Sequence, residues 1–221
     1  MYTVNDLFDL EHTLAADYLR GFTYPHEALP GIKAMIRAVG AGLSADEYEH
    51  VRETVWIARG ARIADTAFIG DDVIIGPETE VRPGAFIRGS ALIGRHCVVG
   101  NSTELKNVIL FDDVQVPHYN YVGDSILGHH AHMGAGAVTS NVKGDRTLVT
   151  VRDGSETLAT GLKKMGAMLG DWAEIGCNSV LNPGTIIGRD CIVYPTSCVR
   201  GVVPERHIYK RGEGCVERIM D

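Results

Sequence analysis

The amino-acid sequence predicts an all-β solenoid with a short helical region at its start. Three features of the 221 residues support this prediction: 26 glycines, few aromatic side chains (7%) and a long six-residue repeat of aliphatic residues. Many tight turns combined with few large core side chains are typical of solenoids. A helix cannot produce this repeat, because six residues are not a whole number of 3.6-residue turns.

Residues 1–50 lack the repeat and are expected to form a helical N-terminal region. Asn5 can cap a first helix, whose apolar positions recur at near-helical spacing at Leu7, Leu10, Leu14 and Leu19. A second helix is expected over 28–39, before Gly40, and Ser44 opens a segment of capping-box form. Nothing in this region points to a reaction.

The repeat defines a domain over residues 51–205. Aliphatic residues stand six apart at Ile57, Ile63, Ile69, Ile75, Val81, Ile87, Ile93, Val99 and Leu105, and again at Leu169, Ile175, Leu181, Ile187, Val193 and Val199. Four positions after each comes a small or β-branched residue, ending at Ile109 in the first set and at Val203 in the second. Each hexad would form one side of a triangular prism with its aliphatic residue inward, and glycines such as Gly100 would ease the turns. Coils of about 18 residues would stack about 4.8 Å apart.

The repeat is interrupted between Leu105 and Leu169, where polar side chains gather. An insertion at about 145–165 contains an Asp-Gly pair between alternating apolar runs, which predicts a hairpin. Because the register resumes after it, we expect the hairpin to wall a pocket and to be unnecessary for the core. Residues 206–221 are expected to form a C-terminal tail.

Composition argues against several classes of function. The net charge is −7 and the pI is near 5.7, with no basic block, which argues against nucleic acid or an anionic membrane as a partner. The first residues are acidic rather than leader-like, and no stretch approaches the roughly 20 apolar residues of a membrane span. Five cysteines without a C-x-x-C pair argue against disulfides and zinc fingers. We therefore expect a soluble cytoplasmic protein.

Four segments along the repeat show a specific family resemblance. They are VRPGAF at 81–86, NSTELK at 101–106, VPHYNYVGD at 116–124 and MGAGAVTSN at 133–141. Together they resemble the acetyltransferase half of the bifunctional glucosamine-1-phosphate acetyltransferases/N-acetylglucosamine-1-phosphate uridylyltransferases. The segment TGLKKMGAMLGD at 160–171 is similar to the β-helix end of archaeal sugar-1-phosphate nucleotidylyltransferases.

This resemblance implies a hexapeptide-repeat left-handed parallel β-helix, acetyl-CoA as the acyl donor, and a homotrimer whose sites are shared between subunits. The implied acceptor is a phosphorylated or nucleotide-linked amino sugar similar to glucosamine 1-phosphate. Fifty residues of helical pattern precede the repeat where the family has a nucleotidyltransferase domain. We therefore do not expect nucleotidyl transfer.

The resemblance also assigns roles to residues. His118 matches the catalytic base, and an imidazole suits this role near neutral pH. The positions implied for acceptor binding are Arg82, Lys106, Tyr121, His132, Asn141, Lys163 and Lys164. Those implied for the coenzyme are Ala135, Gly136, Cys177, Pro195 and Lys210, with a backbone N–H in the turn at 134–136 as the oxyanion donor.

Three positions depart from the family pattern. The family usually has Asn at His132, Tyr at Val142 and Ser at Cys177. The first two border the expected acceptor pocket. They therefore leave the identity of the acceptor open.

Plainer interpretations stay open for the same residues. His118 also fits a hydrogen-bonded loop histidine, and Arg82, Lys106 and the Lys163–Lys164 pair also fit solvated surface charges. The run of His129, His130 and His132 resembles a zinc ligand set, but no two of these histidines have the five-residue spacing of β-helix carbonic anhydrases. We expect no catalytic metal.

Two other functions remain alternatives at this stage. One is a non-catalytic β-helix that serves as an oligomerisation or sensing subunit for a separate nucleotidyltransferase. The weaker one is a metal-dependent hydratase similar to carbonic anhydrase. Thiol release from acetyl-CoA in the presence of hexosamine phosphates would separate an acyltransferase from both.

Overall fold

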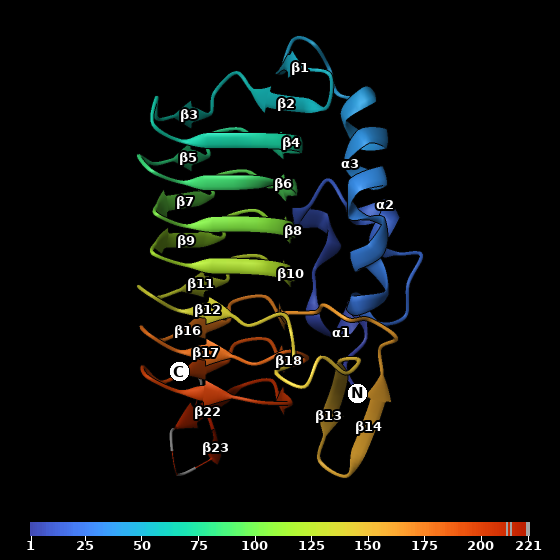
Figure 1. The fold of residues 1–221 in the computed structure, drawn as a ribbon, viewed down its shortest axis with the longest axis vertical. Coiled ribbons are helices and arrows are strands. Elements are labelled where there is room, and N and C mark those ends of the chain that lie inside the picture. The colour runs from blue at the N-terminus through green and yellow to red at the C-terminus, as the bar shows by residue number, and fades with distance from the viewer. Residues whose placement is uncertain (211, 213, 220–221) are drawn as a thin grey trace.

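The structure is a computed structural model that describes residues 1–210, 212 and 214–219. The chain forms a left-handed parallel β-helix of about nine coils, with a helical N-terminal region along one side (Figure 1). This is the predicted fold. No helix among the described residues is long and apolar enough to cross a membrane.

The solenoid has three faces. Face A is one sheet made of β3 (Arg62–Ile63), β5 (Glu80–Val81), β7 (Val98–Asn101), β9 (Gln115–His118), β11 (His132–Met133), β16 (Glu174–Ile175), β19 (Ile192–Val193), β22 (His207–Lys210) and β23 (Gly214–Glu217). The last two strands form an antiparallel hairpin, so the expected C-terminal tail continues this sheet.

Faces B and C share a second sheet, because its long strands bend across the corner between them. These strands are β4 (Phe68–Ile75), β6 (Phe86–Ile93), β8 (Glu104–Leu110) and β10 (Tyr121–Leu127). Lower on face B lie β12 (Val138–Thr139), β17 (Val180–Leu181) and β20 (Cys198–Val199). Lower on face C lie β15 (Ala167–Leu169), β18 (Thr185–Ile187) and β21 (Val202–Val203), and the hairpin of β1 (Tyr48–Arg52) and β2 (Val55–Ala58) begins this sheet.

Residues with positive φ turn the three corners in successive coils. Corner 1, between faces A and B, uses Gly84, Ser102, Tyr119, Gly136, Asn178 and Thr196. Corner 2, between B and C, uses Asp72, Ser90, Asn107, Asp124, Gly184 and Gly201. Corner 3, between C and A, uses Glu78, His96, Asp113, His130, Trp172, Asp190 and Arg206. Most of these residues are not glycine, although the left-handed region favours glycine.

The repeat glycines serve a different purpose from the predicted one. A Cβ atom at Gly100 would lie 1.5 Å from the carbonyl oxygen of Pro117 in the next coil. At Gly176 it would lie 2.4 Å from the nitrogen of Pro195. These glycines therefore allow close approach between coils rather than a special turn conformation.

Coil length is not uniform along the solenoid. Strands β4 and β6 pair with an 18-residue offset, but Gly89 pairs with Lys106, 17 residues on, after an irregularity in β6. Ala91 then aligns with Val108 and Leu92 with Ile109, although a strict count of six places Ile109 level with Ala91. Ile109 therefore lies beside Leu92, on the outer side of face C.

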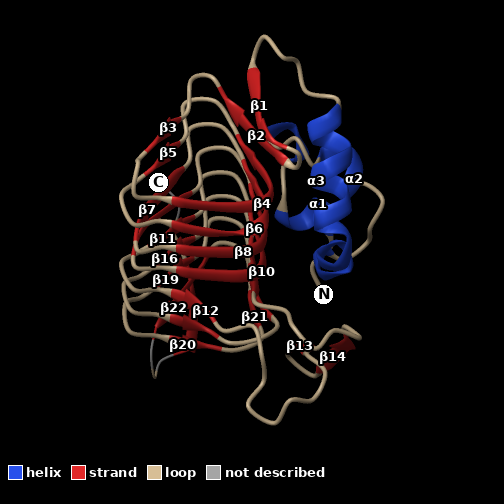
Figure 2. Ribbon diagram, turned by 45° about the horizontal axis from the view of Figure 1, so that its top comes forward, coloured by secondary structure: helices blue, strands red, loops and turns tan. Residues whose placement is uncertain are grey.

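The outer side of face C is covered by the N-terminal region (Figure 2). This region contains α1 (Val4–Leu7), η1 (Leu10–His12), α2 (Ala16–Leu19), η2 (Pro25–Gly31) and α3 (Ile32–Ala41). The outward residues of face C are apolar and buried: Ile74, Leu92, Ile109, Ile126, Met168 and Ile186. Ile32 and Ile36 on α3 are fully buried as well, and α3 contacts β4, β6 and β8. Face C is therefore packed on both sides.

Polar contacts hold the N-terminal region to two corners. At corner 2 the buried carboxylate of Asp72 pairs with Arg37 and Lys33 of α3. At corner 3 the Asp9 N–H donates to Asp171 Oδ2 at 2.7 Å. Burial raises the pKa of Asp171, since the charged form loses hydration there.

The predicted hairpin is present as β13 (Thr150–Asp153) and β14 (Glu156–Ala159). The Met165 N–H donates to the Asn141 carbonyl oxygen at 3.0 Å, which closes the insertion at its base. Val149 and Val151 are fully buried against the lower coils. The expectation that the insertion is unnecessary for the core is therefore wrong.

The covered outer side of face C predicts a position-dependent cost of truncation. We expect Ile109→Ala to lower the free energy of unfolding in urea by about 2–5 kcal/mol, because it leaves a cavity under the helices. Ile192 also points outward, but on the half-buried face A. Ile192→Ala should therefore cost no more than about 1 kcal/mol. Equal costs at the two positions would contradict the described packing.

Candidate functional site

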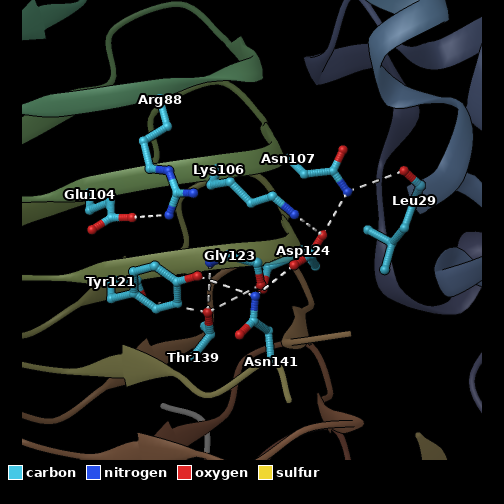
Figure 3. Close-up of polar contacts among 11 residues, drawn as sticks. Leu29, Arg88, Glu104, Lys106, Asn107, Tyr121, Gly123, Asp124, Thr139 and Asn141 are labelled. Carbon is cyan, nitrogen blue, oxygen red and sulfur yellow. Dashed lines mark hydrogen bonds and ion pairs between the residues drawn. The ribbon is translucent and has the colours of Figure 1, made fainter. Parts of the chain in front are cut away.

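A buried carboxylate, Asp124, lies at corner 2 and gathers polar side chains from three coils (Figure 3). Its Oδ1 accepts hydrogen bonds from Lys106 Nζ at 2.8 Å and Asn107 Nδ2 at 3.0 Å. Its Oδ2 accepts one from Asn141 Nδ2 at 2.6 Å. Three donors, one of them charged, offset the loss of hydration of this carboxylate. We call these four residues, together with Tyr121, the Asp124 cluster.

The local backbone explains how these side chains meet. Asn107 and Asp124 occupy equivalent corner positions in β8 and β10, at φ of 54° and 48°. Asn141 follows β12 in the next coil, and its Nδ2 also donates to the Tyr121 hydroxyl at 3.2 Å. Burial raises the pKa of Tyr121, so its hydroxyl stays protonated and can donate to a ligand.

A pocket of about 300 Å³ opens beside Asp124. Leu29 and Pro30 of the N-terminal region line one part of it, and the exit of the insertion brings Lys163 and Lys164 to another. Among the described residues, neither of these two ammonium groups forms a salt bridge. Because Asp124 already balances the charge of Lys106, these two lysines are the cations best able to bind an anion here.

The predicted Arg82 lies apart from this cluster. It is on face A, where its guanidinium pairs with Glu80 at 3.3 Å. Arg88, which sequence analysis did not select, stands one coil above Lys106 and pairs with Glu104 at 2.7 Å (Figure 3). The arginine next to the cluster is therefore Arg88.

His118 ends β9 beside corner 1 and is exposed. The residues aligned with it in the coils below are Ala135, Cys177 and Pro195. Backbone N–H groups of the next coils donate to the carbonyl oxygens of His118, Ala135 and Cys177 at 3.0, 2.8 and 2.8 Å. The predicted base and three predicted coenzyme residues thus form one line along the solenoid, which we call the corner-1 column.

Two further predicted coenzyme positions lie close to this column. Gly136 directly follows Ala135 and turns corner 1. Lys210 lies at the level below Tyr194, with Nζ 5.5 Å from the centre of that ring. In the turn at 134–136, the Gly134 and Gly136 N–H groups donate to other coils, whereas within the described residues the Ala135 N–H has no protein acceptor.

The three neighbouring histidines do not converge on one point. His132 lies on face A, where its Nδ1 is 2.7 Å from Glu174 Oε2, so it does not join the Asp124 cluster. His129 and His130 lie at corner 3, with nitrogens 3.6 and 3.9 Å from Asp113 Oδ2. Burial and the nearby His129 lower the pKa of His130, which favours its neutral form. Asp113, His129 and His130 lie close enough together to hold a metal ion. The three histidines, in contrast, do not form one site.

Known proteins match parts of this chain. A sequence profile of the GMPPB C-terminal domain matches residues 77–155. The Bifunctional protein GlmU of Methanococcus maripaludis is 33% identical over 116 residues, which cover 52% of this chain and 28% of that protein. The bifunctional sugar-1-phosphate nucleotidylyltransferase/acetyltransferase of Sulfurisphaera tokodaii is 30% identical over 112 residues, with 51% and 28% covered. The resemblance to the hexapeptide-repeat acetyltransferases is confirmed. This chain matches less than a third of the length of these relatives.

Solved structures give more distant matches. The acetyltransferase domain of PglB from Neisseria gonorrhoeae in complex with acetyl coenzyme A has a TM-score of 0.36 at 15% identity, covering 85% of this chain and 67% of that one. The UDP-N-acetylglucosamine acyltransferase of Francisella novicida has a TM-score of 0.43 at 14% identity, covering 74% and 68%.

The two main residues that sequence reasoning missed are Asp124 and Arg88. Asp124 lies within the segment 116–124 that supports the resemblance, but an aspartate in a turn gives no sign that it will be buried. Arg88 follows a repeat position, as many solvated charges do. The one-residue change of coil length beside it sets which residues of the next coil it approaches.

The central position of Asp124 predicts a large stability effect. We expect Asp124→Ala to lower the free energy of unfolding by about 3–5 kcal/mol, because it leaves the Lys106 ammonium without a counter-ion in a mostly buried place. Glu104→Ala removes a more exposed pair and should cost about 1 kcal/mol or less. Adding Lys106→Met to Asp124→Ala should recover part of the loss. Additive costs of the two substitutions would contradict the coupling.

Proposed function

We propose that this protein is an acyl-CoA-dependent N-acetyltransferase that acts on a phosphorylated or nucleotide-linked amino sugar. One observation supports this most strongly: the corner-1 column of His118 and small residues lies one face away from the Asp124 cluster and its two lysines. The column offers a base and room for an extended donor. The cluster offers polar and cationic groups for an anionic sugar.

The acceptor side is assigned to the Asp124 cluster and the adjoining pocket. Lys163 and Lys164 would bind the phosphate, while the Tyr121 hydroxyl would donate to a sugar oxygen. Asp124 acts indirectly, since it holds Lys106 and Asn141 in place. Arg88, one coil higher, would add a planar cation suited to a phosphate.

The donor side is assigned to the corner-1 column. Ala135 and Gly136 are half-buried and small, and Cys177 and Pro195 are exposed, so long side chains do not block the backbone along these coils. These residues fit an extended pantetheine arm, and Lys210 would lie near its phosphates. Acetyl-CoA, when bound, supplies the acetyl group as a thioester. The Ala135 N–H is suited to donate to an oxygen of that group.

His118 would carry out the proton transfer. Attack by the sugar nitrogen forms a nitrogen–carbon bond and breaks the carbon–sulfur bond of the thioester. The His118 imidazole would accept the proton that leaves the amine and return it to the departing thiolate. The exposed ring meets the need of this role for access to substrate.

The site is proposed to be completed by a second copy in a homotrimer. His118 lies on face A beside corner 1, whereas the Asp124 cluster lies across face B at corner 2. Since face C is covered by the N-terminal region, faces A and B are the sides open to another subunit. A partner placed along corner 1 would enclose the substrate between chains.

The role of His118 is tested by thiol release from acetyl-CoA with a panel of hexosamine phosphates. We expect His118→Ala to lower kcat by about 10²–10⁴ while coenzyme binding stays nearly unchanged. His96→Ala is the matched control, because His96 is an exposed histidine of the same solenoid at corner 3. Unchanged turnover by the His118 variant would remove it from the mechanism.

The same assay in a chelator separates this function from a metal-dependent hydratase. We expect no loss of acyl transfer, because the Asp113, His129 and His130 trio lies at corner 3, away from both proposed subsites. Loss of a stoichiometric metal together with activity would favour the hydratase.

A further inference from the structure

A second, larger pocket of about 530 Å³ lies below the Asp124 cluster on corner 2. Three cations line it, Lys143, Arg152 and Arg200, against one carboxylate, Asp145. This local excess of positive charge contrasts with the net charge of −7 of the whole chain. Ser140, Thr150 and Asn182 add polar groups to the lining.

The fold holds these cations close together. A Cβ atom on Gly201 would lie 2.6 Å from the Arg152 carbonyl oxygen, so β13 is in close contact with the coil that carries Arg200. Lys143 Nζ donates to the Thr147 hydroxyl at 2.6 Å and lies 3.6 Å from Asp145. Among the described residues, neither Arg152 nor Arg200 pairs with a carboxylate. Two guanidinium groups are thus available to an anion.

The position of this pocket relates it to the acceptor side. Ser140, Asn182 and Arg200 align in three successive coils, as the backbone bonds from Ser140 to Leu181 and from Asn182 to Val199 show. Asn141 of the Asp124 cluster follows Ser140. With coils about 4.8 Å apart, Arg200 therefore lies about 10 Å below Asn141 along the axis. The corner-1 column is on the opposite edge of face B.

We propose that Lys143, Arg152 and Arg200 bind the diphosphate of a nucleotide-linked acceptor sugar. Two guanidinium forks and an ammonium match two adjacent phosphates better than they match a single one. The separation of about two coils leaves room for a sugar between the diphosphate and the Asp124 cluster. This proposal rests on the proposed function. It narrows the acceptor from a phosphorylated or nucleotide-linked sugar to a nucleoside-diphosphate sugar, and it assigns the phosphates to this pocket in place of Lys163 and Lys164.

Binding of uridine diphosphate and inorganic pyrophosphate to the full chain tests this without requiring turnover. By calorimetry, we expect both to bind and Arg200→Ala and Arg152→Ala each to weaken binding about tenfold or more, as for loss of one charge-assisted contact. Arg146→Ala is the control, because Arg146 is exposed in the same insertion but does not line the pocket. Binding should also weaken with added salt.

A second ligand tests whether the pocket binds the phosphates of the acceptor or those of coenzyme A. Binding of adenosine 3′,5′-diphosphate, the phosphate-bearing end of coenzyme A, should not change in Arg200→Ala. If this ligand loses affinity while uridine diphosphate does not, the pocket serves the coenzyme and the proposal is wrong. Equal binding of uridine diphosphate by wild type and both variants would also overturn it. If the variants lose uridine diphosphate but no acyl transfer is found, the pocket assignment stands and the proposed function fails.

Discussion

The ladder of parallel backbone hydrogen bonds between coils is the constraint on which every other feature depends. Most coils return after 16 to 18 residues and the coil that carries the insertion returns after 42, so residues far apart in sequence become vertical neighbours. His118, Ala135, Cys177 and Pro195 align in this way, and so do Ser140, Asn182 and Arg200. A column on such a solenoid is a rigid scaffold with a spacing of about 4.8 Å, which suits extended ligands.

Coverage of face C by the N-terminal region has two consequences. It allows three successive apolar residues in each long strand, since both sides of the sheet are buried there, as at Val73, Ile74 and Ile75. It also places Leu29 and Pro30 against the pocket beside Asp124. The N-terminal region therefore belongs both to the core and to the wall of the candidate acceptor site. The β-helix repeat alone would not form this wall.

The repeat was sufficient to predict the solenoid and its inward aliphatic columns. It did not predict the alignment of Ile109 with Leu92, because a one-residue change in β6 shifts the following strand relative to a strict count of six. It also missed the burial of Val149 and Val151, which depends on long-range docking of the insertion on corner 2. The runs of three apolar residues on face C were a visible signal for an outer layer, since a sheet exposed on one side needs only alternate apolar positions.

The candidate site residues could be predicted where the spacing of the motifs determines which residues of neighbouring coils lie above one another. Lys106, Tyr121 and Asn141 do meet, around a carboxylate that the motif contains but does not mark. Arg82 and His132 lie on face A instead, because the face on which a side chain emerges depends on its distance from the nearest corner. The local pattern of charges in the sequence does not show whether a charged residue will lie on face A or in the Asp124 cluster.

Amide hydrogen exchange of the full chain, with and without coenzyme A, tests the central claim most directly, because it locates the donor without assuming an acceptor. If the donor binds along corner 1, exchange slows at residues 134–136, 176–178 and 195–197 and does not change at the Asp113, His129 and His130 trio of corner 3. Protection at corner 3, or at corner 2 alone, with none along corner 1 would contradict the assignment of the corner-1 column to the acyl donor.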